Sequence, residues 1–170
     1  MGFFRQAAAA ALLVMLTLAF QSSGMAVFIH WGRAHFGTAT QRLGLLHATV
    51  LLVRFTALMF GLHVLQMLLW AAFYRWNCFP TWESAFYFSV TSYSTVGYGD
   101  MVLPHAWRIL GPVESVTGVL MCGLSASLLF AIVTLLVQRE RRFVMEEEKL
   151  DGALLDTVQA PRSEFYAERE

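Results

Sequence analysis

The chain has 170 residues and equal numbers of basic and acidic side chains, so its formal net charge is zero and no basic surface for nucleic acid is expected. Hydrophobic residues make up 57% of the sequence and charged residues only 14%, whereas typical soluble domains contain about 25% charged residues. The composition therefore favours a membrane protein, with the lipid bilayer as its first partner.

Three stretches lack Lys, Arg, Asp and Glu over a length that can cross a membrane. They are residues 6–29, 55–74 and 115–138, which contain 24, 20 and 24 residues. As helices they would each be about 30 to 36 Å long, which spans the hydrocarbon core of a bilayer. A buried helix of a soluble protein can account for one such stretch. Three of them predict an all-α integral membrane protein with three transmembrane helices.

Residues 1–37 are predicted to contain the first transmembrane helix and an inner loop. A cleaved signal peptide is the alternative, because Arg5 precedes an apolar stretch and the small residues Gly24 and Ala26 follow it. Apolar residues continue through Ile29, which favours a retained helix. If the third span ends inside the cell, a retained first helix places the N-terminus outside.

Residues 38–137 are predicted to form one module that contains the other two spans. Arg54 interrupts a long apolar stretch, so residues 38–54 are expected to form an interfacial or extended helix at the inner membrane surface. The outer helix is then expected over residues 55–76. His63 lies inside it and is expected to form a hydrogen bond within the helix bundle.

A short re-entrant helix is predicted over residues 81–93. Pro80 and Thr81 give its start signal, and Glu83 lies in the first turn, where the helix dipole favours an anion. The carboxyl end of this helix would direct partial negative charge at the loop that follows.

That loop has the sequence Thr95-Val96-Gly97-Tyr98-Gly99-Asp100. A dehydrated cation needs a cage of oxygens, and consecutive backbone carbonyls that point toward one axis can supply it. The carbonyls of an ordinary strand alternate in direction. The loop therefore needs positions with positive φ, which glycine adopts without steric cost, and these are expected at Gly97 and Gly99.

These six residues resemble the selectivity filter of the potassium channel superfamily, residue for residue. The resemblance implies that K⁺ ions bind along the filter, residues 95–99, which consists of Thr95, Val96, Gly97, Tyr98 and Gly99. One loop supplies a quarter of the oxygen ring, so a homotetramer with C4 symmetry is expected. K⁺ would be the permeant ion, and no other cofactor is expected.

Asp100 is expected to support the filter from behind. In the family this aspartate is hydrogen-bonded to the pore helix, and some relatives place a glutamate four residues before the filter threonine. Here that position is Thr91, so the familiar pair of carboxyl groups is absent. Tyr87 and Tyr93 are the alternative hydroxyl partners.

The carboxylates are unevenly distributed along the sequence. Nine of the twelve lie in the tail after Arg139, and the other three are Glu83, Asp100 and Glu114. All three are predicted to bracket the outer mouth, partly offset by Arg75 and Arg108. Repetition around a fourfold axis would then concentrate cations there.

The inner helix is expected over residues 107–137, with Pro112 in its first turn. Gly118 and Gly123 lie in its interior, where each glycine weakens a plain helix by about 1 kcal/mol. Either glycine could serve as a gating hinge, or could let neighbouring helices approach closely. The resemblance favours Gly118 as the hinge, and packing is the favoured role of Gly123.

Residues 138–170 are predicted to form a charged cytoplasmic tail. Arg139, Arg141 and Arg142 follow the third span directly, which matches the excess of basic residues on the cytoplasmic side. The segment up to Lys149 can extend the inner helix, and residues beyond Asp151 are expected to be loosely ordered. A tetrameric helical bundle of the tail is the alternative to a solvated one.

Other functions find little support in the sequence. No span has arginine at every third position, so no voltage sensor is encoded. No nucleophile stands beside a base, so an enzyme is not expected. The sequence predicts a K⁺-selective channel in a plasma membrane of bacterial type, with a weakly selective cation channel or a non-conducting subunit or membrane anchor as alternatives.

Overall fold

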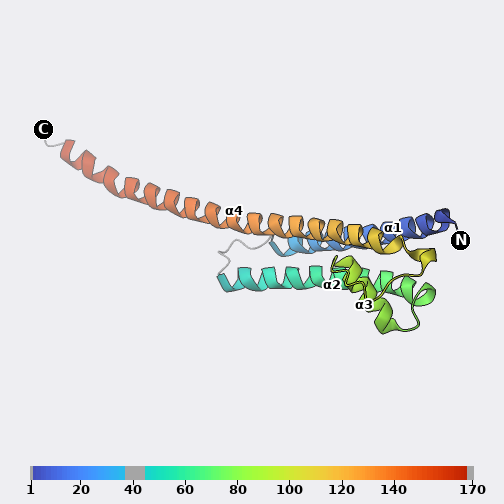
Figure 1. Ribbon diagram of the computed structural model, residues 1–170. Coiled ribbons are helices and arrows are strands. Elements are labelled where there is room, and N and C mark those ends of the chain that lie inside the picture. The colour runs from blue at the N-terminus through green and yellow to red at the C-terminus, as the bar shows by residue number, and fades with distance from the viewer. Residues whose placement is uncertain (1, 37–44, 168–170) are drawn as a thin grey trace.

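The computed structural model describes residues 2–36 and 45–167, and their side chains over residues 2–30 and 46–155. The described residues form helices and no strand (Figure 1). In chain order these are α1 (Phe3–Phe36), α2 (Leu45–Asn77), α3 (Trp82–Tyr93), the short 3₁₀-helix η1 (His105–Trp107) and α4 (Leu110–Ala167). The all-α class predicted from the sequence is confirmed.

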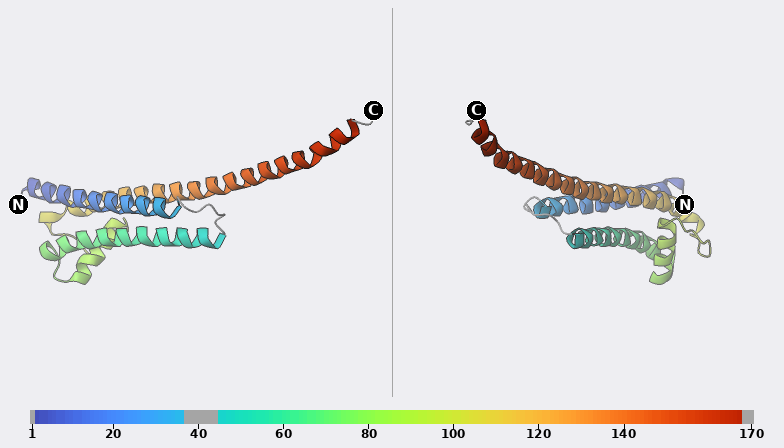
Figure 2. Two further views of the ribbon diagram at one scale, coloured as in Figure 1. Left: turned by 180° about the vertical axis from the view of Figure 1, so that it is seen from behind. Right: turned by 90° about the vertical axis from the view of Figure 1, so that its left-hand side faces the viewer.

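The three long helices lie side by side (Figure 2). α1 and α4 run in the same direction, because Gln6 contacts Ile109 near the start of both and Gln21 contacts Ser125 further along. α2 runs antiparallel to them. The short α3 packs at the end of the bundle that holds the N-terminus, and α4 extends well beyond the other helices at the opposite end.

Three segments are long and apolar enough to cross a membrane, namely Phe3–His30, Leu46–Asn77 and His105–Leu155. Large apolar side chains on their outer faces are exposed, for example Phe60 and Phe130. In water such surfaces would be costly, whereas in lipid they are solvated. The chain is therefore an integral membrane protein, as the composition predicted.

α2 begins earlier than the outer helix expected at residues 55–76. Residues 45–54 continue the same helix through Arg54 without a break, because arginine is a good helix former and the segment contains no glycine or proline. The extended-helix interpretation is therefore the one observed here. The rest of the expected interfacial segment, residues 38–44, lies outside the described residues.

α4 also exceeds its expected length. It starts at Leu110, which leaves Pro112 in the first turn as predicted, and it continues through the tail to Ala167. The expectation of loose order beyond Asp151 is therefore wrong for residues 152–167. Residues 152–167 contain good helix formers such as Ala153, Leu154 and Leu155, and the helix continues through Gly152 and Pro161. Nearer the membrane span, Arg139 lies 5.8 Å from the ring centre of Phe143 one turn later.

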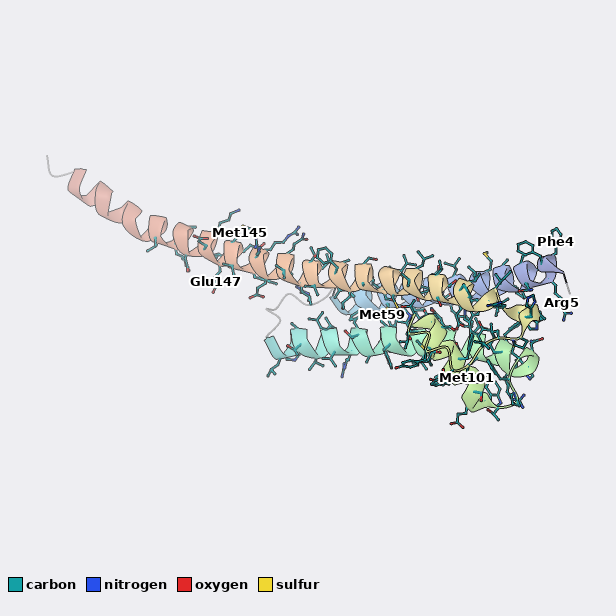
Figure 3. The ribbon with its side chains drawn as sticks, viewed as in Figure 1. Phe4, Arg5, Met59, Met101, Met145 and Glu147 are labelled. Carbon is teal, nitrogen blue, oxygen red and sulfur yellow. The ribbon has the colours of Figure 1, made fainter. Side chains whose placement is uncertain are left out.

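The core lies where α3 wedges between α2 and the start of α4. Trp70 and Tyr74 of α2 are fully buried there, and Tyr74 meets Phe88 of α3 edge to face at 5.1 Å. Figure 3 shows side chains crowded at this end, while Met145 and Glu147 lie on the distal part of α4, beyond the other helices. The core thus fixes the helix that precedes the predicted filter.

Candidate functional site

α3 begins with a well-formed cap. Thr81 is extended, with φ −127° and ψ 154°, and its Oγ1 accepts a hydrogen bond of 3.2 Å from the Ser84 amide. Glu83 lies in the first turn and is exposed. The start signal read from the sequence is confirmed, and α3 is placed one residue after its predicted start.

The loop after α3 has positive φ at every second residue. Gly97 and Gly99 have φ values of 55° and 81°, as predicted. Thr95 also has positive φ, 63°, which the sequence did not reveal because a β-branched residue rarely adopts this conformation. Strain of this kind costs about 1–3 kcal/mol and is concentrated at functional sites. The backbone therefore departs from an ordinary strand in the way that a carbonyl cage requires.

Two hydrogen bonds attach the loop to the end of α3. The Thr95 amide donates to the Ser92 carbonyl at 3.0 Å, and the Gly97 amide donates to the Thr91 carbonyl at 3.1 Å. Residues 94–100 are otherwise exposed, including Tyr98 with 72% of its surface accessible. The chain supports the loop from one side and leaves the other side uncovered.

Asp100 is held by α3. The Tyr87 hydroxyl donates to Asp100 Oδ2 at 2.9 Å, and this hydrogen bond to a carboxylate is the main reason that the pKa of Tyr87 is raised above its ordinary value. Tyr87 is therefore positioned as the expected partner. The Thr91 hydroxyl instead donates to the Phe88 carbonyl of its own helix at 3.0 Å, so its side chain does not support Asp100.

Glu114 is not an outer-mouth charge. Its side chain is fully buried, and it accepts hydrogen bonds from the Tyr74 hydroxyl at 2.8 Å and the Ser89 hydroxyl at 2.6 Å. The expectation is wrong because position 114 belongs to the buried stripe of α4, together with Leu110 and Thr117 one turn to either side. Of the three expected mouth carboxylates, only Glu83 and Asp100 are exposed.

Gly118 is a point of close contact between α4 and the end of α3. A Cβ atom at this position would lie 2.2 Å from the Tyr93 carbonyl oxygen, whereas a Cβ at Gly123 would meet no atom within 4 Å. Close packing therefore accounts for Gly118, and Gly123 has no packing role within the chain. The contact at Gly118 is the packing alternative that the sequence left open, and packing of Gly123 against helices of other copies stays a prediction.

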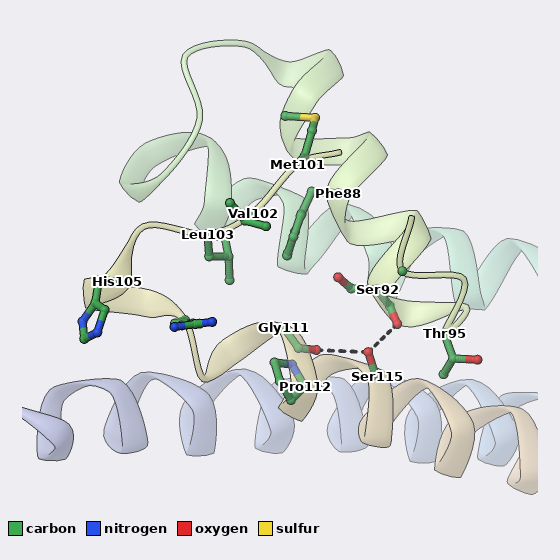
Figure 4. A pocket seen from close by; sticks show the side chains of 12 residues that line it. Phe88, Ser92, Thr95, Met101, Val102, Leu103, His105, Gly111, Pro112 and Ser115 are labelled. Atoms are coloured by element: carbon green, nitrogen blue, oxygen red, sulfur yellow. Dashed lines mark hydrogen bonds between the residues drawn. The ribbon is translucent and has the colours of Figure 1, made fainter. Parts of the chain in front are cut away.

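Ser115 provides a second contact at the same place, which the sequence analysis missed. Its hydroxyl lies 2.7 Å from the Ser92 carbonyl and 3.1 Å from the Gly111 carbonyl (Figure 4). The available signal was its position, one residue after Glu114 and one turn before Gly118, next to the buried stripe of α4.

A cavity of about 600 Å³ opens between α3, the loop and the start of α4 (Figure 4). Its wall includes Thr95 and Gly97 of the loop, together with Ser115, His105 and Arg108. No cluster of His, Cys, Asp and Glu in the described part of the chain could hold a metal ion. Any ion that binds here would depend on backbone and hydroxyl oxygens.

The comparison with protein families supports the interpretation of the loop and its flanking helices as part of an ion channel. The family model described as an ion channel matches residues 62–135, which run from the middle of α2 through α3 and the loop into α4. Neither the curated proteins nor the solved structures gave a significant match. The matched segment includes the whole motif from Thr95 to Asp100 and leaves α1 outside. Residues 62–135 are therefore similar to this ion channel family, and the family resemblance inferred from the filter motif is confirmed.

Proposed function

We propose that this ion channel is selective for K⁺ and that its filter is completed by four copies of the chain. The observation that carries the proposal is the loop itself. The filter sequence of the potassium channel superfamily coincides with positive φ at Thr95, Gly97 and Gly99, directly after a capped helix. A hydrated K⁺ would lose its water at the Tyr98 end and pass between successive rings of carbonyls.

The uncovered side of the loop supports a tetramer. Residues 94–100 are exposed, and a non-helical backbone can lie at membrane depth only if protein buries it or it lines water. Neighbouring copies arranged around an axis would provide both conditions. The end of α3 lies two residues before Thr95, so four such helices would direct partial negative charge toward the cations.

The orientation in the membrane follows from the parallel α1 and α4. The three arginines from Arg139 to Arg142 support a cytoplasmic location for the distal end of α4. The N-terminus then shares the outer side with the filter, and Arg5 lies 5.2 Å from the ring centre of Trp107 in η1. Glu83 and Asp100 would supply the exposed negative charge of the outer mouth, in the plasma membrane of a bacterial cell.

Ion flux from liposomes tests selectivity. Liposomes that contain the purified full chain are loaded with KCl or NaCl and diluted into the other salt, and the efflux of each cation is recorded. K⁺ efflux that greatly exceeds Na⁺ efflux is expected. Equal effluxes would indicate a weakly selective cation channel, and no efflux would indicate a non-conducting subunit. Native mass spectrometry of the same preparation should give four copies.

Two glycines provide a matched pair for this assay. A Cβ at Gly97 or at Gly123 would meet no atom within 4 Å, but only Gly97 has positive φ. Gly97→Ala should therefore abolish selective K⁺ efflux through backbone conformation alone, whereas Gly123→Ala should retain K⁺ over Na⁺ selectivity. Selective flux in Gly97→Ala would contradict the role of the loop as the filter.

A further inference from the structure

Two glutamines are fully buried within the apolar spans of α1 and α2. Gln21 lies on α1 and Gln66 on α2, and neither exposes any surface. A polar side chain within a membrane span is costly unless it is hydrogen-bonded, and in such a position it usually joins helices. Both amides are therefore expected to have partners.

Hydrogen bonds of the two glutamines link α2 to α1 and α1 to α4. The Gln66 amide nitrogen donates to Gln21 Oε1 at 2.7 Å, and the Gln21 amide nitrogen donates to Ser125 Oγ of α4 at 3.0 Å. In both bonds the side-chain nitrogen of a glutamine donates to a residue of a neighbouring helix. These two bonds use the side-chain oxygen of Gln21 but leave that of Gln66 available for another donor.

That oxygen accepts the hydroxyl proton of Tyr93. His63 Nδ1 lies 2.9 Å from the same hydroxyl, and because a tyrosine hydroxyl has one proton, already donated to Gln66, His63 is the donor in this second bond. The expectation that His63 is hydrogen-bonded within the bundle is confirmed. The series therefore runs from His63 through Tyr93, Gln66 and Gln21 to Ser125.

Tyr93 connects this series to the filter. It is the last residue of α3, it is almost completely buried, and its carbonyl contacts Gly118 of α4. Thr95, with its left-handed backbone, follows two residues later. A displacement of the Tyr93 ring would move the end of α3 and the residues that anchor the loop.

We propose that Gln21 and Gln66 are positioning residues of the filter, so that α1 is part of the filter's support. α1 lies outside the matched segment 62–135, yet Gln21 reaches the end of α3 through a single intervening side chain. α1 makes a second polar contact with α2, a hydrogen bond of 3.0 Å from Trp70 to Thr17. Among the described residues, no hydrogen bond connects this pair to α3, although Trp70 packs in the same apolar cluster as Phe88. The proposal rests on the proposed function for its effect on selectivity, but not for its effect on the backbone of the loop.

Hydrogen exchange followed by mass spectrometry tests the backbone effect in the purified full chain. Gln21→Met keeps the size of the side chain and removes the acceptor of the Gln66 amide. The amides of Thr95 and Gly97 should then exchange about tenfold faster, because a buried hydrogen bond contributes a comparable factor. Thr17→Val, one turn away on α1, should leave these amides unchanged. Unchanged exchange in Gln21→Met, or equal acceleration in Thr17→Val, would overturn the proposal.

A double mutant tests the path through Tyr93. Tyr93→Phe removes only the hydroxyl that donates to Gln66, so it should accelerate exchange at Thr95 and Gly97 by itself, even if Gln21→Met does not fold. In the Tyr93→Phe background, Gln21→Met should add little. If the acceleration in the double mutant equalled the product of the accelerations in the two single mutants, a path from Gln21 through Tyr93 to the loop would be excluded. Ser125→Ala leaves the path from Gln21 to Tyr93 intact and should match the wild type.

The flux assay separates this proposal from the proposed function. In a wild type that is selective for K⁺, Gln21→Met should lower the K⁺ to Na⁺ efflux ratio and Thr17→Val should not; an unchanged ratio in Gln21→Met would contradict the effect on selectivity. If the wild type itself is not selective, the proposed function fails, while the exchange measurements still decide whether α1 supports the loop.

Discussion

The beginning of α4, residues 110–125, and the rest of the helix differ in what surrounds them; in the proposed orientation they are its outer and its inner half. From Leu110 to Ser125 a buried stripe packs against α3 and the other helices, whereas none of the described side chains from 126 to 155 is buried. The outer half therefore belongs to the support of the filter within one chain. The inner half has lipid, water or other copies as its surroundings, so a given substitution should have different effects in the two halves.

Gly118→Ala should have the largest effect. Its Cβ would lie 2.2 Å from the Tyr93 carbonyl oxygen and 3.0 Å from the carbonyl carbon, so a backbone must move, and overpacking of this kind costs about 1–3 kcal/mol or more. Thermal unfolding should show a lower Tm, and selective K⁺ flux should be lost. Gly123→Ala, at an exposed position in the same part of α4, is the control and should retain both.

A different result would favour the hinge hypothesis. If Gly118→Ala kept its Tm and its selectivity but changed the open probability in single-channel records, a hinge at Gly118 would explain it better than close packing. The contrast between the halves of α4 would then be weaker than the packing indicates.

Glu114→Leu should have the second largest effect. The substitution leaves the Tyr74 hydroxyl without its acceptor inside the core, and an unsatisfied buried group costs about 1–3 kcal/mol. The Ser89 hydroxyl loses its bond to Glu114 but can still donate to the Met67 carbonyl at 2.9 Å. A decrease in Tm and a loss of tetramer are expected. Glu83→Leu, at an exposed carboxylate of α3, should leave Tm nearly unchanged, and equal losses in the two variants would contradict the buried role of Glu114.

Glu114 and Gly118 also show which features of the fold the sequence alone did not predict. The sequence was sufficient for the three spans, the start of α3 and the positive φ of Gly97 and Gly99, because length, capping and glycine each have a local physical cause. The direction in which a helix faces depends on its neighbours. Charge alone placed Glu114 at the mouth, although its spacing of four residues from Leu110 and Gly118 indicates the packed face.

The polar residues of the bundle were missed for a related reason. Gln66 stands among apolar residues, and Gln21 begins the short polar group Gln21-Ser22-Ser23. Neither pattern predicts the partner of the glutamine or the direction of its side chain. Thr17 and Gln21 are one turn apart, as are Gln66 and Trp70, and this spacing marks one polar face on each helix. That signal indicates a contact between α1 and α2. The link to Tyr93 needs the three-dimensional structure.

Thr81→Ala tests the outer end of α3, where support comes from a cap rather than from packing. Loss of the hydrogen bond from the Ser84 amide should lower the free energy of unfolding by about 1 kcal/mol. Denaturant unfolding would measure it, with Thr81→Ser as the control that keeps the hydroxyl. A loss as large as that of Gly118→Ala would indicate that the cap, and not the contact with α4, dominates the support of α3.

The contact between Tyr87 and Asp100 should give the smallest effect, a change in how stability depends on pH. Since the hydrogen bond to Asp100 raises the pKa of Tyr87, the neutral phenol is favoured in the folded chain. Its stabilising contribution is present below the unfolded pKa of about 10 and is lost as the pH rises through the raised value. The difference in alkaline absorbance between the wild type and Tyr87→Phe isolates this group, and Asp100→Asn should shift its titration to lower pH. An unshifted titration in Asp100→Asn would mean that the pair does not hold the outer end of the loop, and the support of the filter would then rest on the contacts of α3 with α4 and α2.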